Sequence, residues 1–431
     1  GFGIFYDLED GALNLQFGGE APYGHVVDIT PSDYSGVTPG TDTIGDPYTP
    51  FGLTNPFPTN GVLGSTFDVP AVSFAYVVDP HFRTPYSENA NFGLQFQLTP
   101  DTMIEADYVG SFARKTVVTT DVNAPLPSIM QQQLALSGDI NPECARPLAG
   151  CADPTDIDSS PTGALQLLTD LSAGNSSTHQ LQFTVDKRFS HGFNIRGAYT
   201  FSKTIDDQSG FRYNSSLFTD PFNPSFDRGL ANFDVTHRLV ISGIWKLPLD
   251  RPFRGGNNFA RKLAEGWEVS GIASFQSGTP FTVFSGSGSS GEDTFLERAD
   301  QIGPLRTFAP KSTHTFNDPS GGPSSDCISG KTTGSFYFAP SSFSCDNALL
   351  TFGDSGRNIF RGPGRNNFDL TVGRTFGVGE GKTVEFRAEM FNAFNHAQFF
   401  NPDHQGGDAN FGQITQARPP RIIQLALKFY F

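Results

Sequence analysis

Apolar and polar side chains alternate with a period of two in many segments of this chain. In one of them, three apolar side chains alternate with two charged ones: Val384, Glu385, Phe386, Arg387 and Ala388. This alternation is typical of a β-strand whose two faces meet different surroundings, because successive side chains point to opposite faces. The pattern predicts ten strands, at residues 1–7, 91–98, 102–112, 179–188, 193–205, 235–248, 267–279, 367–376, 382–390 and 421–431.

The lengths of these strands and of their connections indicate the class of β protein. Most strands exceed the five or six residues usual in soluble proteins and fit the roughly 9 to 11 residues of a tilted membrane-spanning strand. The connections alternate between short ones, at 99–101, 189–192, 249–266 and 377–381, and long ones, at 8–90, 113–178, 206–234, 280–366 and 391–422. Transmembrane barrels combine short periplasmic turns with long extracellular loops in this way. We therefore predict an all-β fold, an antiparallel transmembrane β-barrel with long extracellular loops and short periplasmic turns.

The residues that interrupt the apolar face support this interpretation by their positions. The polar exceptions lie near strand ends, where a side chain can reach headgroups or water, and are His179, Lys187, His237 and Arg374. Aromatic side chains on the same face gather toward both ends of the strands, as two interfacial girdles would. Aromatic and β-branched residues populate the strands of any β protein, however, so a soluble β-sandwich or propeller stays as the alternative.

Composition narrows the functional classes. Charged residues make up 17% of the 431, below the usual value of about 25%, whereas Phe alone occurs 43 times. The 47 Gly and 31 Pro residues favour strands joined by turns and loops over a helical bundle. The net charge of −15, with no basic block, argues against nucleic-acid binding. No apolar run approaches the roughly 18 residues of a membrane-spanning helix.

Six segments together resemble one family of outer-membrane proteins. They are RTPY at 83–86, GFNIRGAYTFSK at 192–203, FDVTHR at 233–238, GWEVSG at 266–271, RGPG at 361–364 and FRAEMFNAFNH at 386–396. As a set they are similar to the C-terminal half of Oar-like TonB-dependent outer-membrane transporters. They cover nearly all the predicted strands but few of the long loops, and any one of them alone is a weak match.

The resemblance implies an assembly larger than this chain. Such transporters have a barrel of about 22 strands around an N-terminal plug, preceded by a segment that engages the TonB complex. The chain opens with Gly1 and has neither an initiator Met nor a signal peptide. We therefore expect residues 1–431 to be one domain, the C-terminal part of the barrel, with plug, signal peptide and TonB contact missing. A fragment of ten strands would be an open sheet, whereas a complete small barrel would pair its first and last strands.

The end of the chain resembles the assembly signal of outer-membrane barrels, a terminal aromatic residue preceded by apolar residues at every second position. The matching residues are Ile423, Leu425, Leu427, Phe429 and Phe431. The resemblance implies two partners, the barrel-assembly machinery and the lipid of the outer membrane of a Gram-negative-type bacterium.

Charged residues lie on the polar face of the predicted strands. These candidate lumen-facing charges are Glu105, Asp107, Arg196, Arg238, Lys246, Glu268, Asp369, Glu385, Arg387 and Glu389. Mixed charges hydrate a lumen or pair with a plug, which is the interpretation we favour, although two carboxylates could also serve a retaining glycosidase. The sequence contains no phosphate-binding Gly-rich loop, no G-x-S-x-G, no H-E-x-x-H and no EF-hand pattern. We expect neither an enzyme nor a bound cofactor.

The four cysteines fall as two local pairs in long loops, Cys144 with Cys151 and Cys327 with Cys345. The predicted topology places both pairs outside the cell, where an oxidising compartment permits disulfides. Paired spacings such as C-x2-C, which a four-cysteine metal site needs, are missing. We therefore expect disulfides, with free thiols and a metal site as the alternatives.

Two connections suggest local features, an acidic cluster in one and a short helix in the other. The loop at 206–234 contains four aspartates, Asp206, Asp207, Asp220 and Asp227. They form either a solvated acidic loop, which we favour, or a calcium site. Residues 258–265 predict a short amphipathic helix that caps the floor of the barrel.

Together these patterns predict an outer-membrane, TonB-dependent transport protein that moves an unidentified large or scarce solute by uptake or export. The alternative from another class is a secreted β-rich adhesin or glycan-binding module, whose aromatic strands would pack into a soluble core. An extracellular hydrolase is a third hypothesis, which rests only on the paired carboxylates.

Overall fold

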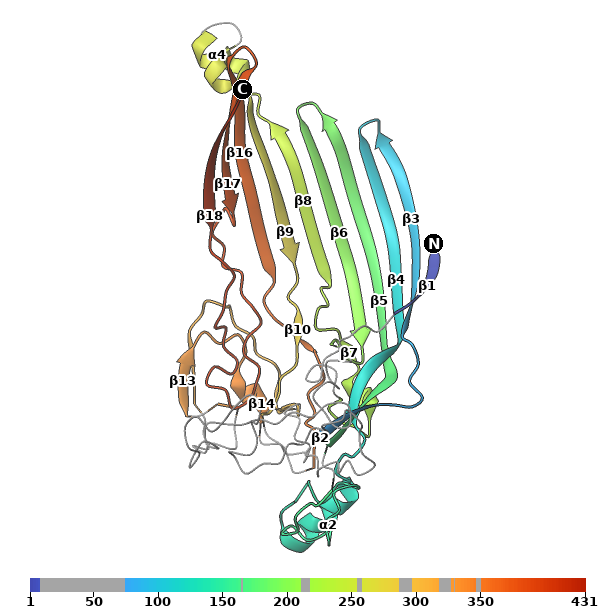
Figure 1. Ribbon diagram of the computed structural model, residues 1–431. Coiled ribbons are helices and arrows are strands. Elements are labelled where there is room, and N and C mark those ends of the chain that lie inside the picture. The colour runs from blue at the N-terminus through green and yellow to red at the C-terminus, as the bar shows by residue number, and fades with distance from the viewer. Residues whose placement is uncertain are drawn as a thin grey trace, which may run out of the picture. The chain divides into compact units, whose positions relative to one another are not determined.

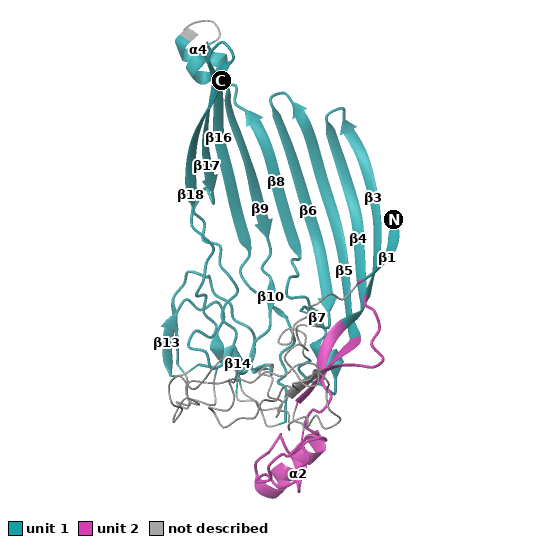
Figure 2. Cartoon of the chain, in the orientation of Figure 1, with its two compact units in different colours: residues 1–6, 86–116, 173–431 teal, residues 7–85, 117–172 magenta. Residues whose placement is uncertain are grey.

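The computed structural model describes residues 1–7, 74–163, 166–210, 218–253, 258–286, 297–317, 327–328, 330–345 and 350–431. The chain divides into two compact units (Figure 2). Unit 1 comprises Gly1–Tyr6, Tyr86–Thr116 and Ala173–Phe431, and unit 2 comprises Asp7–Pro85 and Val117–Ser172. Most of the predicted long loop at 8–90, namely residues 8–73, lies outside the described residues.

Ten strands form one antiparallel sheet in which they follow one another in chain order (Figure 1). The strands are β1 (Phe2–Tyr6), β3 (Tyr86–Thr99), β4 (Thr102–Asp121), β5 (Gln166–Ser190), β6 (Phe193–Asp206), β8 (His237–Lys246), β9 (Trp267–Gln276), β16 (Arg365–Gly379), β17 (Lys382–Phe391) and β18 (Ile422–Tyr430). All ten predicted strands are therefore confirmed. The main differences are in β4, which runs to Asp121, and in β5, which already begins at Gln166, where its first five residues pair with a further strand at 74–78. The ten strands belong to unit 1 except for the end of β4 and the start of β5.

Short turns join the strands at one end of this sheet. Between β5 and β6, His191 and Gly192 both have positive φ, of 53° and 91°. Positive φ at both central residues is the requirement of a type I′ turn, whose twist matches that of the strands it joins. The predicted turns at 99–101 and 377–381 are equally tight, since Thr99 pairs with Thr102 and Gly379 pairs with Lys382.

The sheet is open. β1 and β18 stand at its two ends, and no pairing between them occurs among the described residues. Of the two expected outcomes, an open sheet and a small closed barrel, the structure has the open sheet.

The long connections of unit 1 fold into a compact structure of their own. Short antiparallel strands pair within it: β10 (Pro280–Phe281) with β15 (Phe360–Arg361), β11 (Asp300–Gln301) with β14 (Phe343–Ser344), and β12 (His314–Asn317) with β13 (Lys331–Gly334). A two-residue strand, β7 (Gly229–Leu230), extends β6, and the 3-10 helices η2 (Pro224–Asp227) and η4 (Pro340–Ser342) complete the segment. We call residues 280–361 and 392–417 of this structure, where described, the loop core.

The connection between β8 and β9 carries the 3-10 helix η3 (Arg251–Phe253) and the α-helix α4 (Asn258–Ala264), as the sequence predicted for 258–265. Gly266 follows with φ of 81°, a left-handed conformation that lets the chain leave the helix and enter β9. Within the described part of the chain, no helix has both the length and the apolar character needed to cross a membrane.

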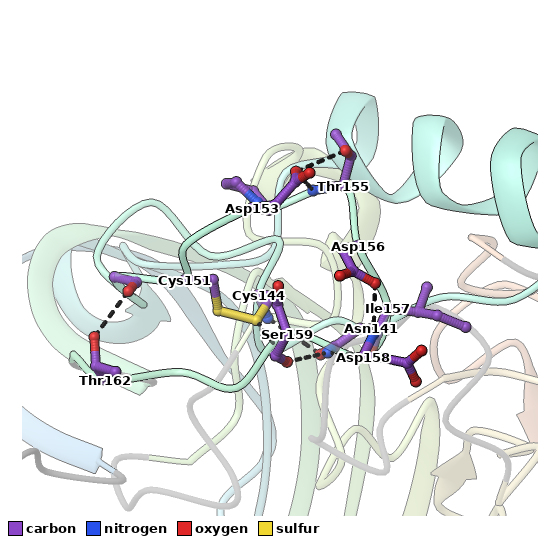
Figure 3. The surroundings of a disulfide bond; sticks show 12 residues. Asn141, Cys144, Cys151, Asp153, Thr155, Asp156, Ile157, Asp158, Ser159 and Thr162 are labelled. Carbon is purple, nitrogen blue, oxygen red and sulfur yellow. Dashed lines mark hydrogen bonds between the residues drawn. A yellow bond between two sulfur atoms is a disulfide. The ribbon is translucent and has the colours of Figure 1, made fainter.

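Unit 2 contains β2 (Phe74–Val78), which pairs in parallel with the start of β5, and the helix α2 (Pro127–Ser137). The disulfide between Cys144 and Cys151 closes a small loop beside this helix, and Asn141 donates hydrogen bonds to Ile157 O and Ser159 O at 2.8 and 3.0 Å (Figure 3). A buried ion pair between Arg146 and Asp121 joins this loop to the end of β4.

Candidate functional site

The register of the strands places the predicted charges on one face of the sheet. Residues directly opposite one another on neighbouring strands share a face. One such row crosses five strands and consists of Asp186, Arg196, Ser242, Ile272 and Asp369. The polar face thus brings together charges of both signs from β5, β6 and β16.

A second row lies nearer the short turns. Lys246 on β8 is directly opposite Glu268 on β9, which is opposite Gly373 on β16. Gly373 is in turn opposite Arg387 on β17. Because Gly373 has no side chain, the row leaves a space between Glu268 and Arg387.

Arg387 is the centre of a small ion-pair cluster in this region. Its Nη2 donates a hydrogen bond of 2.5 Å to Glu389 Oε1, and its Nε lies 3.7 Å from Glu385 Oε1. The hydroxyl of Tyr430 on β18 donates to Glu385 Oε2 at 2.7 Å. Both carboxylates therefore contact the same guanidinium, which is the arrangement of a structural cluster on a hydrated surface rather than of two carboxylates facing a sugar.

Two hollows on the polar face coincide with these charges. The one near the middle of the strands has a volume of about 580 Å³, and the one nearer the short turns about 520 Å³. Charged residues line both: Asp186, Arg196, Asp369 and Glu389 the first, and Lys246, Glu268, Glu385 and Arg387 the second. The remaining predicted charges alternate with apolar side chains on their own strands, and are Glu105, Asp107 and Arg238. Water and a polar solute have direct access to such a surface.

On the opposite, apolar face, each of the four polar exceptions has an aromatic partner. The ring nitrogen Nδ1 of His179 lies 2.8 Å from the hydroxyl of Tyr108. His237 contacts Tyr199 at the same distance. The other two are cations over rings: Lys187 Nζ lies 4.4 Å from the centroid of Phe193, and the guanidinium of Arg374 lies 5.6 Å from that of Trp267. The aromatic groups predicted as girdles thus satisfy the polar groups at the ends of the strands.

The five residues of the predicted assembly signal form one exposed stripe. Four of them lie on β18 opposite apolar residues of β17, with Leu427 opposite Phe386 and Phe429 opposite Val384. Phe431 follows the last strand residue, and its ring centroid is 5.9 Å from that of Phe429. The stripe continues the apolar face to the edge of the sheet.

Two neighbouring short turns are linked through Asp101. Its Oδ2 accepts hydrogen bonds from the hydroxyl of Ser190 and from Lys187 Nζ, the latter at 3.2 Å, and Thr99 Oγ1 donates to Oδ1 at 2.7 Å. The bonds from Ser190, Thr99 and Lys187, in that order, hold the pKa of Asp101 well below its usual value. The turn between β3 and β4 is thereby tied to the end of β5.

The loop core has a dense aromatic interior. Phe338 packs edge-on against Phe343 and Phe411, with ring centroids 5.6 and 5.3 Å apart, and stacks on Phe281. The disulfide between Cys327 and Cys345 lies in the same cluster. Free cysteines are absent from the structure, so neither a free-thiol nor a metal interpretation of the four cysteines fits. The described parts of the loop core are therefore packed around one shared interior.

Three buried or partly buried Asp–Arg pairs join the connection after β6 to the loop core. Arg298 Nη2 donates to Asp227 Oδ1 at 2.5 Å, and both side chains are almost completely buried. Arg357 Nη1 donates to Asp206 Oδ1 at 2.8 Å. Arg361 donates to Asp234, which precedes β8. Burial lowers the pKa of Arg298, and the charge of Asp227 opposes this.

These pairs correct the expectation for the acidic loop. Asp206 and Asp227 are buried and each faces an arginine, so the loop is not a solvated acidic segment. Asp207 pairs with the more exposed Arg228, and burial raises the pKa of Asp220. No group of three or more acidic, His or Cys side chains suited to a metal ion occurs among the described residues. One of these ion pairs involves residues that the sequence had already singled out, because Asp234 and Arg361 lie in the FDVTHR and RGPG segments.

Comparison with known proteins gives a family and a set of distant structures. The family model described as "Outer membrane beta barrel domain" matches residues 1–424. No curated protein matches significantly. Among solved structures, the outer membrane transporter YddB from Escherichia coli is 10% identical with a TM-score of 0.39, and covers 81% of this chain and 33% of its own. BauA, the ferric preacinetobactin receptor from Acinetobacter baumannii, is 11% identical with a TM-score of 0.37, over 81% of this chain and 30% of that chain.

The ferripyoverdine receptor of the outer membrane of Pseudomonas aeruginosa is 9% identical, with a TM-score of 0.35 over 81% of this chain and 27% of that chain. This chain therefore spans about a third or less of the length of the solved structures it matches. Likeness at this level indicates no substrate.

Proposed function

Because the chain belongs to the outer membrane β-barrel domain family, we propose that it is the C-terminal part of a TonB-dependent transporter of the Oar-like type. The protein is located in the outer membrane. In the proposal, it moves a large or scarce solute across that membrane, the polar face of the sheet lines the lumen, and the apolar face contacts lipid.

The observation that carries the proposal is the contrast between the two faces of the ten-stranded sheet. Apolar side chains such as Leu94 and Leu427 are 63% and 72% exposed, on strands at opposite ends of the sheet. In a secreted adhesin the same side chains would have to be covered by a second layer, since so large an apolar surface is unfavourable in water. Lipid covers it without further protein.

The polar face supports transport rather than catalysis. Its charges of both signs lie around two hollows, and the carboxylates nearest to each other, Glu385 and Glu389, both contact Arg387. A surface of this kind hydrates a channel and can contact a plug or a passing solute. The ordered loop core supports capture of a solute outside the cell, because a preformed surface loses little entropy on binding.

The open edges of the sheet support the proposal that further strands complete the barrel. Unpaired backbone groups at β1 and β18 would cost several kcal/mol each in hydrocarbon. Pairing with other strands of a longer protein removes this cost. The six segments that resemble Oar-like transporters come from both halves of the sheet, and they support the TonB-dependent subtype.

The proposal is tested in cells that produce the full-length parent protein. After mild reduction, a membrane-impermeant thiol reagent should label Cys151, which is partly exposed whereas Cys144, Cys327 and Cys345 are buried, on intact cells. The protein should also require detergent for extraction. If Cys151 is labelled only after the cells are lysed, the assignment of the outer and inner sides is wrong, and recovery in the soluble extracellular fraction would end the proposal. Uptake or export that is unchanged when the TonB complex is deleted would reject TonB dependence alone.

A further inference from the structure

The helix α4 is attached to the apolar face of the sheet. The carbonyl of Leu263 in its last turn accepts a hydrogen bond of 3.1 Å from Trp267 Nε1. The carbonyl of Lys262 accepts one from Arg374 Nη2. Trp267 and Arg374 are directly opposite each other on β9 and β16, and Trp267 contacts Phe386, which is opposite Leu427. The helix is therefore held from the same face as the exposed apolar stripe, and not from the polar face.

This attachment corrects the expectation that the helix caps the floor of the barrel. A cap over the lumen would be held by residues of the polar face, such as Lys246 or Glu268. The two side chains that hold α4 instead alternate with those residues. Figure 1 shows α4 at the end of the sheet that carries the short turns and the C-terminus.

The surface of α4 is both apolar and basic. Phe259 and Leu263, four residues apart and hence on one side of the helix, are 76% and 60% exposed. Arg261 and Lys262 are exposed next to them, and Arg374 adds a third cation at the foot of the helix. The carboxylate of Glu265, directly after the helix, lies 3.9 Å from Arg261 Nε.

Arg374 is placed as an interfacial cation would be. Its guanidinium carbon lies 5.6 Å from the ring centroid of Trp267 and 5.3 Å from that of Phe376. Nη2 is used by the helix carbonyl, whereas the buried Nε has no hydrogen-bond partner within the described parts of the chain. A cation beside the last carbonyls of a helix is also favoured by the helix dipole.

We propose that α4, with Trp267 and Arg374, is an interfacial anchor that binds the phospholipid surface of the periplasmic leaflet, with a preference for anionic headgroups. The inference rests on the proposed function, which makes the apolar face lipid-facing and the short-turn end periplasmic. Lipid is the occupant because the patch continues the lipid-facing wall without interruption through Trp267. The cations of Arg261, Lys262 and Arg374 favour an anionic surface. Phe259 and Leu263 match the acyl boundary beneath it.

The test uses single labels in the full-length parent protein with its disulfides oxidised. Phe259→Cys is labelled with an environment-sensitive fluorophore and reconstituted in vesicles of phosphatidylethanolamine and phosphatidylglycerol that carry shallow or deep nitroxide lipids. Two references have similar exposure: Leu94→Cys on the apolar face, 63% exposed, and Leu136→Cys on α2, 75% exposed. We expect the Phe259 label to be blue-shifted and quenched by shallow nitroxides, the Leu94 label by deep ones, and the Leu136 label to report water.

The outcomes separate the anchor from the proposed function. If the Leu94 label reports lipid while the Phe259 label behaves like that at Leu136, the anchor is rejected and the barrel placement stands. If the Leu94 label also reports water, the proposed function fails and the anchor with it. If the Phe259 label is shielded in detergent without lipid, to an extent that depends on protein concentration, the patch binds a second copy and the proposal is overturned.

A second pair of variants tests the headgroup preference. Replacing Arg261 and Lys262 by Gln should remove most of the increase in quenching that phosphatidylglycerol produces at the Phe259 label. The matched control replaces Arg306 and Lys311, two exposed cations of the loop core, by Gln and should leave that increase unchanged. An unchanged dependence on phosphatidylglycerol in the α4 variant would reject the anionic preference.

Discussion

The hydroxyl of Tyr199 on β6 lies 2.8 Å from Nδ1 of His237 on β8, on the apolar face of the sheet. The next such pair along the sheet, Tyr108 with His179, has the same distance between the same atoms. His237 also packs against Phe201, with ring centroids 5.3 Å apart. A polar ring nitrogen on the apolar face is thus paired with a tyrosine of the neighbouring strand, which gives these aromatic residues a role besides the lipid contact that the proposed function assigns to them.

The first prediction concerns this pair. Tyr199→Phe removes the hydroxyl and leaves His237 Nδ1 without this partner, which should lower the free energy of unfolding by about 0.5–1.5 kcal/mol, the usual net value of a hydrogen bond. In a double-mutant cycle with His237→Phe, measured by urea unfolding in lipid vesicles, the two effects should not add. The cycle for Tyr108 and His179 should give a coupling free energy of similar size. Additive effects in both cycles would show that the contacts contribute nothing to stability.

The second prediction concerns the buried pair between Asp227 and Arg298. Arg298→Met leaves a buried carboxylate unpaired, which usually costs about 3–5 kcal/mol, so the loop core should lose protection from hydrogen exchange. Adding Asp227→Leu removes the unpaired carboxylate and should restore part of the protection from hydrogen exchange. The restoration is incomplete because Thr219, which donates to Asp227 through its backbone N–H and its hydroxyl, loses its acceptor.

The control for this prediction is the exposed pair between Arg228 and Asp207, in which half of the Arg228 side chain is accessible. Arg228→Met should change stability by no more than about 1 kcal/mol. Equal effects of the two arginine substitutions would contradict a special contribution of the buried pair.

These ion pairs mark the limit of prediction from the sequence. The ten strands could be predicted from local alternation, because a strand whose two faces meet different surroundings alternates apolar and polar side chains over only a few residues. Asp206 and Arg357, in contrast, are 151 residues apart, and nothing in their neighbours specifies the partner. The rings of Phe281 and Phe338 carry no periodicity either, since short strands and turns bring them together. Loop structure of this kind depends on tertiary contacts that one sequence does not reveal.

The helix α4 illustrates a second limit. Its existence could be predicted from the spacing of Phe259 and Leu263. Its attachment could not, because the alternation places Trp267 and Arg374 on the apolar face without showing that their polar atoms bond to Leu263 O and Lys262 O.

The third prediction is a pH dependence of the loop core. His404 stacks on Phe281, with ring centroids 5.8 Å apart, and its buried Nδ1 has no hydrogen-bond partner among the described residues. Burial lowers the pKa of His404 below its usual value of 6.5, and the charges of Asp403 and Asp408 only partly oppose this. The unfolded chain therefore binds the proton at a higher pH than the folded one, so stability is full above about pH 6.5 and falls as the pH decreases below it.

Hydrogen exchange of peptides from 397–417, corrected for the intrinsic rate, should be faster at about pH 5 than at about pH 8. His404→Phe should flatten this dependence. His314→Phe is the control, because His314 Nε2 already has a partner in the hydroxyl of Ser312 at 2.9 Å. If the pH dependence survives in the His404 variant but disappears in the His314 variant, His314 is the residue that titrates and the prediction is wrong.

The last prediction is that Phe431 acts in assembly and not in transport or stability. Its side chain is 95% exposed, lies beyond the end of β18, and stacks only on Phe429 among the ring contacts of the described residues. Even full burial of such a ring in lipid would be worth about 1.5–3 kcal/mol, a small loss for a barrel with so many lipid-facing side chains. Stability alone thus predicts near-normal surface levels after Phe431→Ala.

The assembly hypothesis predicts instead that full-length protein with Phe431→Ala accumulates unfolded in the periplasm or is degraded, while the few inserted molecules keep normal transport per molecule. Phe96→Ala is the matched control, because Phe96 is an exposed aromatic residue of the apolar face near a short turn, far from the C-terminal stripe. Surface abundance, measured on intact cells by labelling the partly exposed Cys151 after mild reduction, should fall strongly in the first variant and little in the second. Both variants lose the same type of side chain, but only Phe431→Ala alters the end of the strand that a folding machine would engage. Equal abundance of the two would therefore leave Phe431 as one more exposed ring of the apolar face.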